Sequence, residues 1–236
     1  PPYRLTLRGR IDERMMHGPK LVLTTELSTE AGSSTFQIKD TVTNSSANPA
    51  EFQLLYHCNF GAPLLGEGSQ LFAPLKRVVP MNERAAEGDI RSFATYAGPT
   101  AGFVEQVYCI EPYGNASGST ELLLANKSRD RGAAMAYSLR TLPYLTVWKN
   151  TAAAEDGYVT GIEPGTNFPY NRRLERVAGR VPKLAGGKSY EVEIKVSLLA
   201  SKEGVANTRK SIESIQANRP TEFVAKPEAP VLPEEN

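Results

Sequence analysis

The regular alternation of apolar and polar residues constrains the fold of this chain more than any other feature. Tyr3, Leu5 and Leu7 alternate with polar residues near the start, which is the pattern of a half-buried strand. The alternation returns at 21–27 and 36–42, and it is clearest at 188–200. Apolar residues at helical spacing are almost absent until the end of the chain. The sequence therefore predicts an all-β protein made of long antiparallel strands.

Further strands and one long connection complete the expected architecture. The alternation predicts additional strands at 50–57, 103–111, 119–127, 132–139, 144–150 and 157–163. Gly and Pro interrupt residues 61–102, which we expect to form a long loop of the kind that often walls a binding site. We predict one large twisted antiparallel β-sandwich over 1–202. Residues 203–236 are expected to add a short helix at 203–217 and an extended Pro-rich tail.

Composition and charge limit the classes of ligand that this chain is expected to bind. The 27 basic and 26 acidic residues give a formal net charge of +1, which provides no field for nucleic acid or an anionic membrane surface. No apolar run approaches the roughly 18 to 20 residues that span a bilayer. We expect a soluble protein with a small neutral ligand and no nucleic-acid or membrane partner. The compartment stays open, with the cytoplasm favoured over secretion, and the oligomeric state is not indicated.

The sequence gives little indication of metal or cofactor binding. Motifs for phosphate loops, zinc proteases and redox cysteine pairs are absent, and two histidines with two cysteines make a closed zinc site a poor fit. We therefore predict no metal and no cofactor. Cys58 and Cys109 are expected to be free thiols rather than a pair, because a chain of this length does not need a disulfide for stability.

His57 is a candidate for proton transfer. It lies in the segment Leu54–Gly61, where polar and aromatic residues gather at the end of a predicted strand. The alternative is a core histidine bonded to one backbone carbonyl. The second histidine, His17, lies in a loop-like context, and we expect it to be structural or exposed.

Glu163 is the second candidate. It ends an apolar strand just before Pro164 and Gly165. Partial shielding there would raise the pKa of its carboxyl toward neutrality, which suits a general base. The alternative is a turn carboxylate that accepts backbone amides. Asn167, in the same segment, is a candidate sugar contact.

The only tryptophan, Trp148, lies beside Lys149 in a predicted strand. Sugars present apolar C–H faces and hydroxyl edges, so a sugar site needs an aromatic platform with charged and amide partners around it. Trp148, Lys149 and Asn150 supply such groups. The alternative is a buried core tryptophan with Lys149 in solvent, because neighbours on a strand point to opposite faces.

Taken in order and spacing, these segments resemble the galactose mutarotase-like superfamily, in particular a functionally unassigned group of proteins related to aldose 1-epimerase. The resemblance extends over nearly the whole chain, to about residue 200. It rests on residues 40–44, 54–65, 105–107, 142–150, 158–169 and 184–187.

The resemblance implies a mutarotase-like sandwich that binds a monosaccharide or a derivative of one. His57 would then be the general acid, with Asn59 next to it, and Glu163 the general base. Glu105 would contact sugar hydroxyls. Ring opening by these two groups interconverts anomers without a cofactor. Aldose epimerases carry a further histidine and arginine upstream of the matched region, so we expect this sandwich to lack its N-terminal strands.

Two other functions remain open on the same fold, because fold does not fix function. One is a sugar-binding or sensing protein without turnover. The other is a lyase or hydrolase acting on a polysaccharide, which for hydrolysis would need a suitably separated pair of carboxylates such as Glu105 and Glu163. The sequence does not identify the sugar.

Overall fold

Two large sheets dominate the computed structural model, which describes residues 3–232. The seven-stranded sheet has the order β1 (Arg4–Arg14), β2 (Lys20–Glu30), β3 (Thr35–Asn44), β14 (Ser189–Leu199), β10 (Gly132–Ser138), β9 (Ser119–Ala125) and β6 (Gln70–Phe72). The six-stranded sheet has the order β15 (Glu222–Phe223), β7 (Leu75–Pro80), β8 (Gln106–Pro112), β11 (Tyr144–Asn150), β12 (Val159–Gly165) and β5 (Cys58–Phe60). A small sheet pairs β4 (Ala50–Glu51) with β13 (Lys183–Leu184). Apart from β15, which is parallel to β7, the pairs are antiparallel, which confirms the predicted fold class.

The main core lies between the two large sheets. Val78, Ile110 and Val147 of the six-stranded sheet belong to the same buried cluster as Leu122 and Ile194 of the seven-stranded sheet. Each is less than 2% exposed. Full burial of such a side chain stabilises the fold by about 1.5–3 kcal/mol. The apolar residues of the two-residue alternation are thus those that point inward from each strand.

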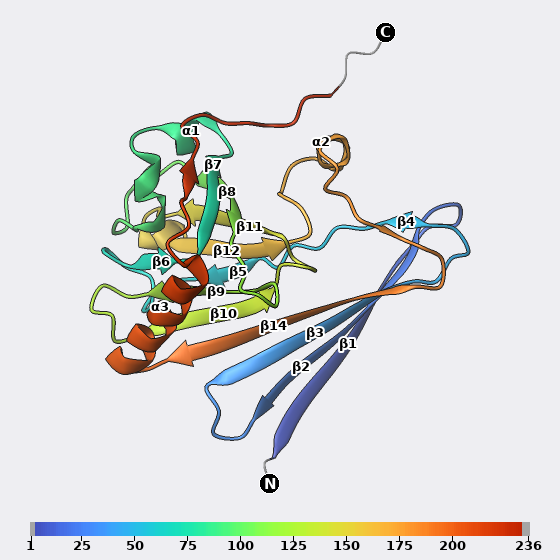
Figure 1. Cartoon of the computed structure of the whole chain (residues 1–236), viewed down its shortest axis with the longest axis horizontal. Helices are drawn as coiled ribbons and strands as arrows, with labels where there is room; N and C mark the ends of the chain where they lie inside the picture. The colour runs from blue at the N-terminus through green and yellow to red at the C-terminus, as the bar shows by residue number, and fades with distance from the viewer. Residues whose placement is uncertain (1–2, 233–236) are drawn as a thin grey trace.

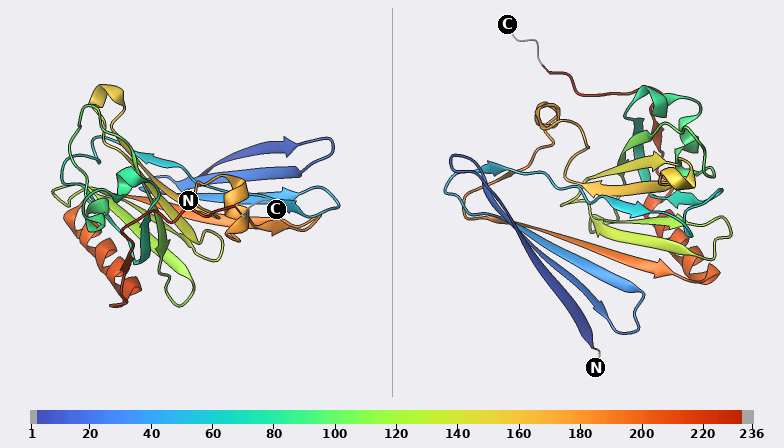
Figure 2. Two further views of the ribbon diagram at one scale, coloured as in Figure 1. Left: turned by 90° about the horizontal axis from the view of Figure 1, so that it is seen from above. Right: turned by 180° about the vertical axis from the view of Figure 1, so that it is seen from behind.

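Four long strands extend beyond the sandwich. β3, β2 and β1 fan out from β14, and β1 is the outermost (Figure 1). Both further views show these strands reaching away from the remainder of the molecule (Figure 2). A second cluster that includes Leu21, Val42 and Phe52 covers their face near β4. Every residue of β1 is exposed, so the far part of this face meets solvent.

The loop predicted over 61–102 is the main error in the sequence-based architecture. The segment contains β6, β7, the short helix α1 (Glu83–Ala86) and the 3₁₀ helix η1 (Ile90–Ala94). β6 and β7 are short strands that pair with β9 and β8. The apolar runs of β6 and β7 are too short to be recognised as strands in the sequence. The two segments become strands because each pairs with the open edge of a longer strand.

The strand predicted over 50–57 is also only partly correct. The structure has a strand at Ala50–Glu51 and a single bridge between Leu55 and Gly165. Tyr56 N donates to Pro164 O, and the N–H of Thr166 donates to Leu54 O, so the segment follows β12 irregularly.

Helix α3 (Lys202–Gln216) confirms the helix predicted at 203–217. The Ser201 side chain caps it by accepting from the Gly204 N–H, and the buried Val205 and Ile212 pack on β9 and β10. The short helix α2 (Arg172–Val177) was not predicted; it begins after Asn171, whose side chain accepts from Arg173 N. Within residues 3–232 no helix is both long enough and apolar enough to cross a membrane.

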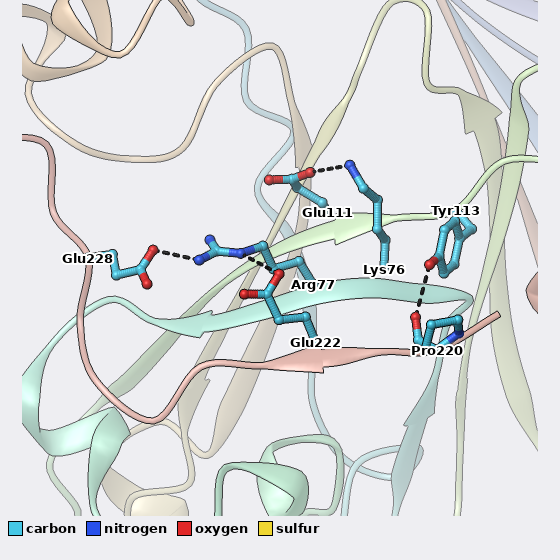
Figure 3. Close-up of polar contacts among 7 residues, drawn as sticks. All are labelled: Lys76, Arg77, Glu111, Tyr113, Pro220, Glu222 and Glu228. Carbon is cyan, nitrogen blue, oxygen red and sulfur yellow. Dashed lines mark hydrogen bonds and ion pairs between the residues drawn. The ribbon is translucent and has the colours of Figure 1, made fainter.

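The Pro-rich tail follows the edge of the six-stranded sheet, although residues 233–236 lie outside the described part. Arg77 of β7 pairs with Glu222 at 3.0 Å and with Glu228 at 2.5 Å (Figure 3). The Tyr113 hydroxyl donates to Pro220 O at 2.9 Å. Val224 packs against a buried cluster that includes Val79 and Phe168. The tail is therefore held by main-chain pairing, apolar contacts and ion pairs together.

The tail's ion pairs and its apolar contacts make separable contributions to stability. Glu222→Gln combined with Glu228→Gln is expected to lower the free energy of unfolding by less than about 1 kcal/mol, because both carboxylates are exposed. Removal of the chain from Glu222 onward is expected to lower it by about 2 kcal/mol, because Phe223 and Val224 leave half-buried positions. Urea denaturation compares the three proteins. Equal losses in both variants would contradict this division.

Candidate functional site

The register of β12 with its neighbours gathers the candidate residues on one face. Gly161 of β12 lies opposite Trp148 of β11 on one side and opposite Asn59 of β5 on the other. Side chains two residues apart on a strand share a face. Glu163 therefore lies on the face of Gly161. His57 precedes β5, and its Cε1 lies 3.3 Å from the position that a Cβ atom of Gly161 would occupy. The structure brings residues from three segments into one cluster.

His57 and Glu163 are in direct contact. His57 Nε2 lies 3.0 Å from Glu163 Oε1. The His57 side chain is 49% exposed, whereas that of Glu163 is 3% exposed. The contact does not have hydrogen-bond geometry, and Glu163 Oε1 has no hydrogen-bond donor among residues 3–232. A buried carboxylate oxygen with an unused acceptor site lies beneath an exposed imidazole.

Burial controls the protonation of Glu163. Loss of solvent raises the pKa of its carboxyl, and the nearby charge of His57 opposes that rise. The carboxyl therefore keeps its proton to a higher pH than an ordinary glutamate, whose pKa is about 4.3. Burial, and secondarily the charge of Glu163, also raise the pKa of the Cys58 thiol to about 11. Cys58 stays protonated at neutral pH and does not compete as a nucleophile.

Trp148 and Glu105 extend the cluster outward. The Trp148 and His57 rings meet edge to face, with centroids 5.5 Å apart and an interplanar angle of 66°. Trp148 Nε1 donates to Glu105 Oε2 at 2.7 Å. Glu105, which precedes β8, is exposed, and Trp148 is half-buried. Glu105, Trp148, His57 and Glu163 thus form one continuous row.

Gly161 is a site residue that the sequence analysis did not single out. A Cβ atom at this position would lie 2.2 Å from Glu163 Oε1 and 3.3 Å from His57 Cε1. No side chain fits there while Glu163 keeps its position beside His57. A glycine inside a strand pattern often marks such a close approach, and this was the available signal.

Two expected sugar contacts are not brought to this face. Lys149 follows Trp148 on β11 and points to the opposite side, where Nζ donates to Phe93 O at 2.9 Å and to Thr95 O at 2.7 Å. Desolvation lowers the pKa of Lys149 to about 8. Its contacts hold η1 against the sheet. The alternative considered for Lys149, a solvent-exposed side chain, does not describe this buried position either.

Asn167 is also buried, and its side chain is bonded within its own segment. Its amide donates to Phe168 O at 2.6 Å, and its Oδ1 accepts from the Thr166 hydroxyl at 2.9 Å. These bonds shape the chain after β12. Asn59, in contrast, is exposed on the same face as Gly161.

The two cysteines do not form a disulfide. Cys58 is half-buried and Cys109 is buried, and both are free thiols, as the sequence analysis favoured. His17 is exposed in the turn between β1 and β2. Within the described residues no group of three or more His, Cys, Asp and Glu side chains is arranged to hold a metal ion.

Two large hollows on the molecule do not include this cluster. Their volumes are about 930 and 900 Å³. One lies beside the β1–β2 turn and α2, and the other on the seven-stranded sheet. Neither is lined by His57 or Glu163. The candidate site therefore rests on its residues and not on these hollows.

The family comparison matches most of the chain. The family model described as "Domain of unknown function (DUF4432)" matches residues 1–198. A search of curated proteins finds no match. The structure of a "putative aldose 1-epimerase" from Klebsiella pneumoniae is 36% identical in sequence, with a TM-score of 0.93. The match covers 99% of this chain and 60% of that protein, so the chain spans well under two thirds of its relative's length.

More distant structures share the fold. A galactose mutarotase-like protein from Clostridium acetobutylicum is 13% identical with a TM-score of 0.58, and the match covers 84% of this chain and 63% of that one. An aldose epimerase homologue from C. elegans is 11% identical with a TM-score of 0.55, covering 85% and 67% of the two chains. The resemblance stated from the sequence is confirmed at the level of the fold.

The buried carboxylate of Glu163 should reduce stability. A carboxyl whose pKa is raised by folding binds its proton more tightly in the folded chain, so stability falls as pH rises above the unfolded pKa. Glu163→Gln is expected to raise the free energy of unfolding by about 1 kcal/mol at pH 7, and by less at pH 4. Urea denaturation at the two pH values measures the difference.

Glu155→Gln provides the matched control, because Glu155 is an exposed glutamate in the 3₁₀ helix η2 (Ala154–Asp156). This variant should show no comparable gain. A gain in Glu163→Gln that is the same at both pH values would contradict the assignment to a buried charge.

Proposed function

Because this chain belongs to the family described as "Domain of unknown function (DUF4432)", within the galactose mutarotase-like superfamily, we propose its function from its site. In this proposal the protein binds a small sugar and interconverts its anomers by acid–base ring opening. One observation carries the proposal: His57 Nε2 lies 3.0 Å from the buried Glu163 Oε1, an oxygen without a hydrogen-bond donor in the described part of the chain.

The reaction requires two proton transfers at neighbouring atoms. Ionised Glu163 removes the proton of the anomeric hydroxyl, and protonated His57 donates to the ring oxygen. The bond between the anomeric carbon and the ring oxygen then breaks, which leaves an open-chain aldehyde. Rotation of the aldehyde and return of both protons close the ring as the other anomer. Each positioned transfer accelerates a reaction by roughly 10²- to 10⁴-fold.

The short distance between the two groups suits this chemistry. The anomeric hydroxyl and the ring oxygen are bonded to the same carbon, so a base for one and an acid for the other must also be close. Glu163 is covered, and His57 is half exposed. A shift of the His57 ring opens the route by which the sugar hydroxyl reaches Glu163 Oε1.

Three neighbours supply sugar contacts in this proposal. The Trp148 ring offers an apolar surface for the C–H face of the sugar. Its Nε1 engages one oxygen of Glu105, which leaves the other oxygen to accept from a hydroxyl. Asn59 adds an amide on the same face. Lys149 and Asn167 are omitted because their polar groups are bonded elsewhere. Proton transfer alone requires no metal or cofactor.

Sugar binding without turnover is the second candidate, and the same contact favours it. In the observed arrangement the His57 ring covers Glu163 Oε1. A sugar that stacks on Trp148 and does not displace this ring would be bound and released unchanged. Such a protein would report the presence of a sugar rather than convert it.

Anomer exchange tests the proposal directly. Saturation-transfer NMR with a panel of free aldoses is expected to show faster exchange with the wild-type protein. Glu163→Gln and His57→Gln should each lose about 100-fold or more of the acceleration. Glu155→Gln and His17→Gln, which change exposed residues outside the site, should retain it. Binding of a sugar without acceleration would replace the proposal by the sensing function.

The pH dependence of kcat/KM should reflect the ionisation of Glu163. The base must be ionised, so kcat/KM is expected to fall as pH decreases through the raised pKa of Glu163. The acid limb should therefore lie above pH 4.3, the approximate pKa of an unperturbed glutamate. Rates measured from pH 4 to 8 locate the limb after subtraction of spontaneous exchange. A rate that stays constant down to pH 4 would show that a different group is the base.

A further inference from the structure

His57 is the central residue of a tight three-residue turn. Cys58 N donates to Tyr56 O at 2.9 Å, which closes the turn around His57. The Tyr56 and Cys58 side chains pack against the main core cluster between the sheets, whereas His57 contacts Glu163 and Trp148 on the other face. The direction of the His57 ring therefore depends on how its two neighbours are held inside the sandwich.

Main-chain contacts tie this turn to the six-stranded sheet. Cys58 begins β5 and lies opposite Ile162 of β12. Tyr56 N donates to Pro164 O at 2.9 Å. Both contacts join the turn to β12, the strand that carries Glu163. They do not fix the direction of the Tyr56 ring, which is set by the contacts of the side chain itself.

The opposite sheet holds the Tyr56 ring. Its hydroxyl donates to Asp40 Oδ2 at 2.6 Å. Asp40 belongs to β3 and lies opposite Val192 of β14, a member of the main core cluster, so the two side chains share the inward face. Burial, and secondarily this bond, raise the pKa of Tyr56, so its hydroxyl remains a donor at neutral pH. The bond thus joins the seven-stranded sheet to the residue before His57.

Packing alone does not account for a carboxyl at position 40. Asp40 is 5% exposed, and its Oδ1 has no hydrogen-bond donor among residues 3–232. A buried polar group without a partner costs free energy, and an apolar pair of the same shape would fill the space without that cost. The Asp40–Tyr56 pair provides what an apolar pair would not, which is a fixed direction for the Tyr56 ring.

We propose that Asp40 and Tyr56 are positioning residues that hold the His57 imidazole over Glu163. The inference rests on the proposed function, in which an acid and a base act at two oxygens bonded to one carbon. The hydrogen bond between the sheets fixes the Tyr56 ring, and the three-residue turn transmits that position to His57. His57 Nε2 is thereby kept 3.0 Å from Glu163 Oε1. Neither positioning residue needs to touch the sugar.

Imidazole NMR signals test this geometry without a substrate. The chain has two histidines, so ¹³C labelling of histidine gives two ring Cε1–H signals, of which exposed His17 is the internal reference and His57→Gln assigns the other. The His57 signal carries a ring-current shift from Trp148, whose ring centroid lies 5.5 Å away. Spectra are recorded near pH 8, above the ordinary pKa of histidine. Tyr56→Phe is expected to move the His57 signal toward its position in the urea-unfolded chain and to leave the His17 signal unchanged.

Tyr190→Phe is the matched control. Tyr190 is also half-buried against the main core cluster, and its hydroxyl donates to Thr141 O at 2.7 Å. Tyr190→Phe removes a similar bond from a residue that is not adjacent to His57, so the His57 signal should stay in place. Asp40→Asn keeps an acceptor for the Tyr56 hydroxyl and should preserve most of the ring-current shift, whereas Asp40→Leu should lose it.

A double variant covers the case in which a single substitution alters folding. Tyr56→Phe combined with Asp40→Leu removes both polar groups, and replacement of both partners by apolar groups can leave stability nearly unchanged. Urea denaturation is expected to give a free energy of unfolding close to that of the wild type. The His57 signal is expected to move as it does in Tyr56→Phe.

Anomer exchange measures the consequence for the proposed reaction. Tyr56→Phe and the double variant should lower kcat by roughly 10- to 100-fold, because a displacement of about 1 Å can cost that much. KM should change little, since the acid acts in the transition state. Asp40→Asn should recover most of the rate that Asp40→Leu loses, and Tyr190→Phe should retain the wild-type rate.

Failure of this inference is distinguishable from failure of the proposed function. A His57 signal that stays in place in Tyr56→Phe and in the double variant would overturn the positioning role, whether or not the protein accelerates anomer exchange. An equal displacement in Tyr190→Phe would assign the effect to general loosening of the core and would overturn it as well. Displacement of the signal as expected, without acceleration by the wild-type protein, would support the positioning role and reject the proposed reaction.

Discussion

Antiparallel register within the six-stranded sheet is the constraint on which the candidate site depends. β12 aligns Gly161 with Trp148 on one side and with Asn59 on the other, and the same alignment carries His57 to Glu163. A slip of one residue would turn every one of these side chains to the other face. The buried residues of β11 and β12, such as Val147 and Ile162, resist that slip because they belong to the core. Packing between the sheets thus positions the candidate residues on the opposite face.

The same two strands serve different purposes on their two faces. On one face Trp148 and Glu163 surround an open position left by Gly161. On the other, the Lys149 ammonium holds the η1 segment through two backbone carbonyls. An ammonium group in that buried setting is costly unless it is well bonded. The strands of the candidate site are therefore packed from behind by groups that have no part in the proposed reaction.

The sequence predicted strands with a clear local pattern better than strands that depend on a distant partner. Alternation was sufficient for the long strands, for example 144–150, which agrees with β11. His57 and Glu163 were singled out from strand ends and from a resemblance, and the structure places their side chains in contact. Short strands such as β6 depend on a partner distant in sequence, so no local pattern revealed them. Alternation placed Trp148 and Lys149 on opposite faces, but only the fold shows which of the two faces the core region.

The edges of the two sheets differ greatly in length. β1 has 11 residues, whereas the other edge strands among residues 3–232 have two or three: β6, β15 and β5. A filament grows only when each molecule offers two complementary surfaces, one for each neighbour. Among the described residues only one edge strand is long, and it lies in the sheet that does not carry the candidate site. A strand that paired with β1 would extend the seven-stranded sheet and leave the register of β11 and β12 unchanged.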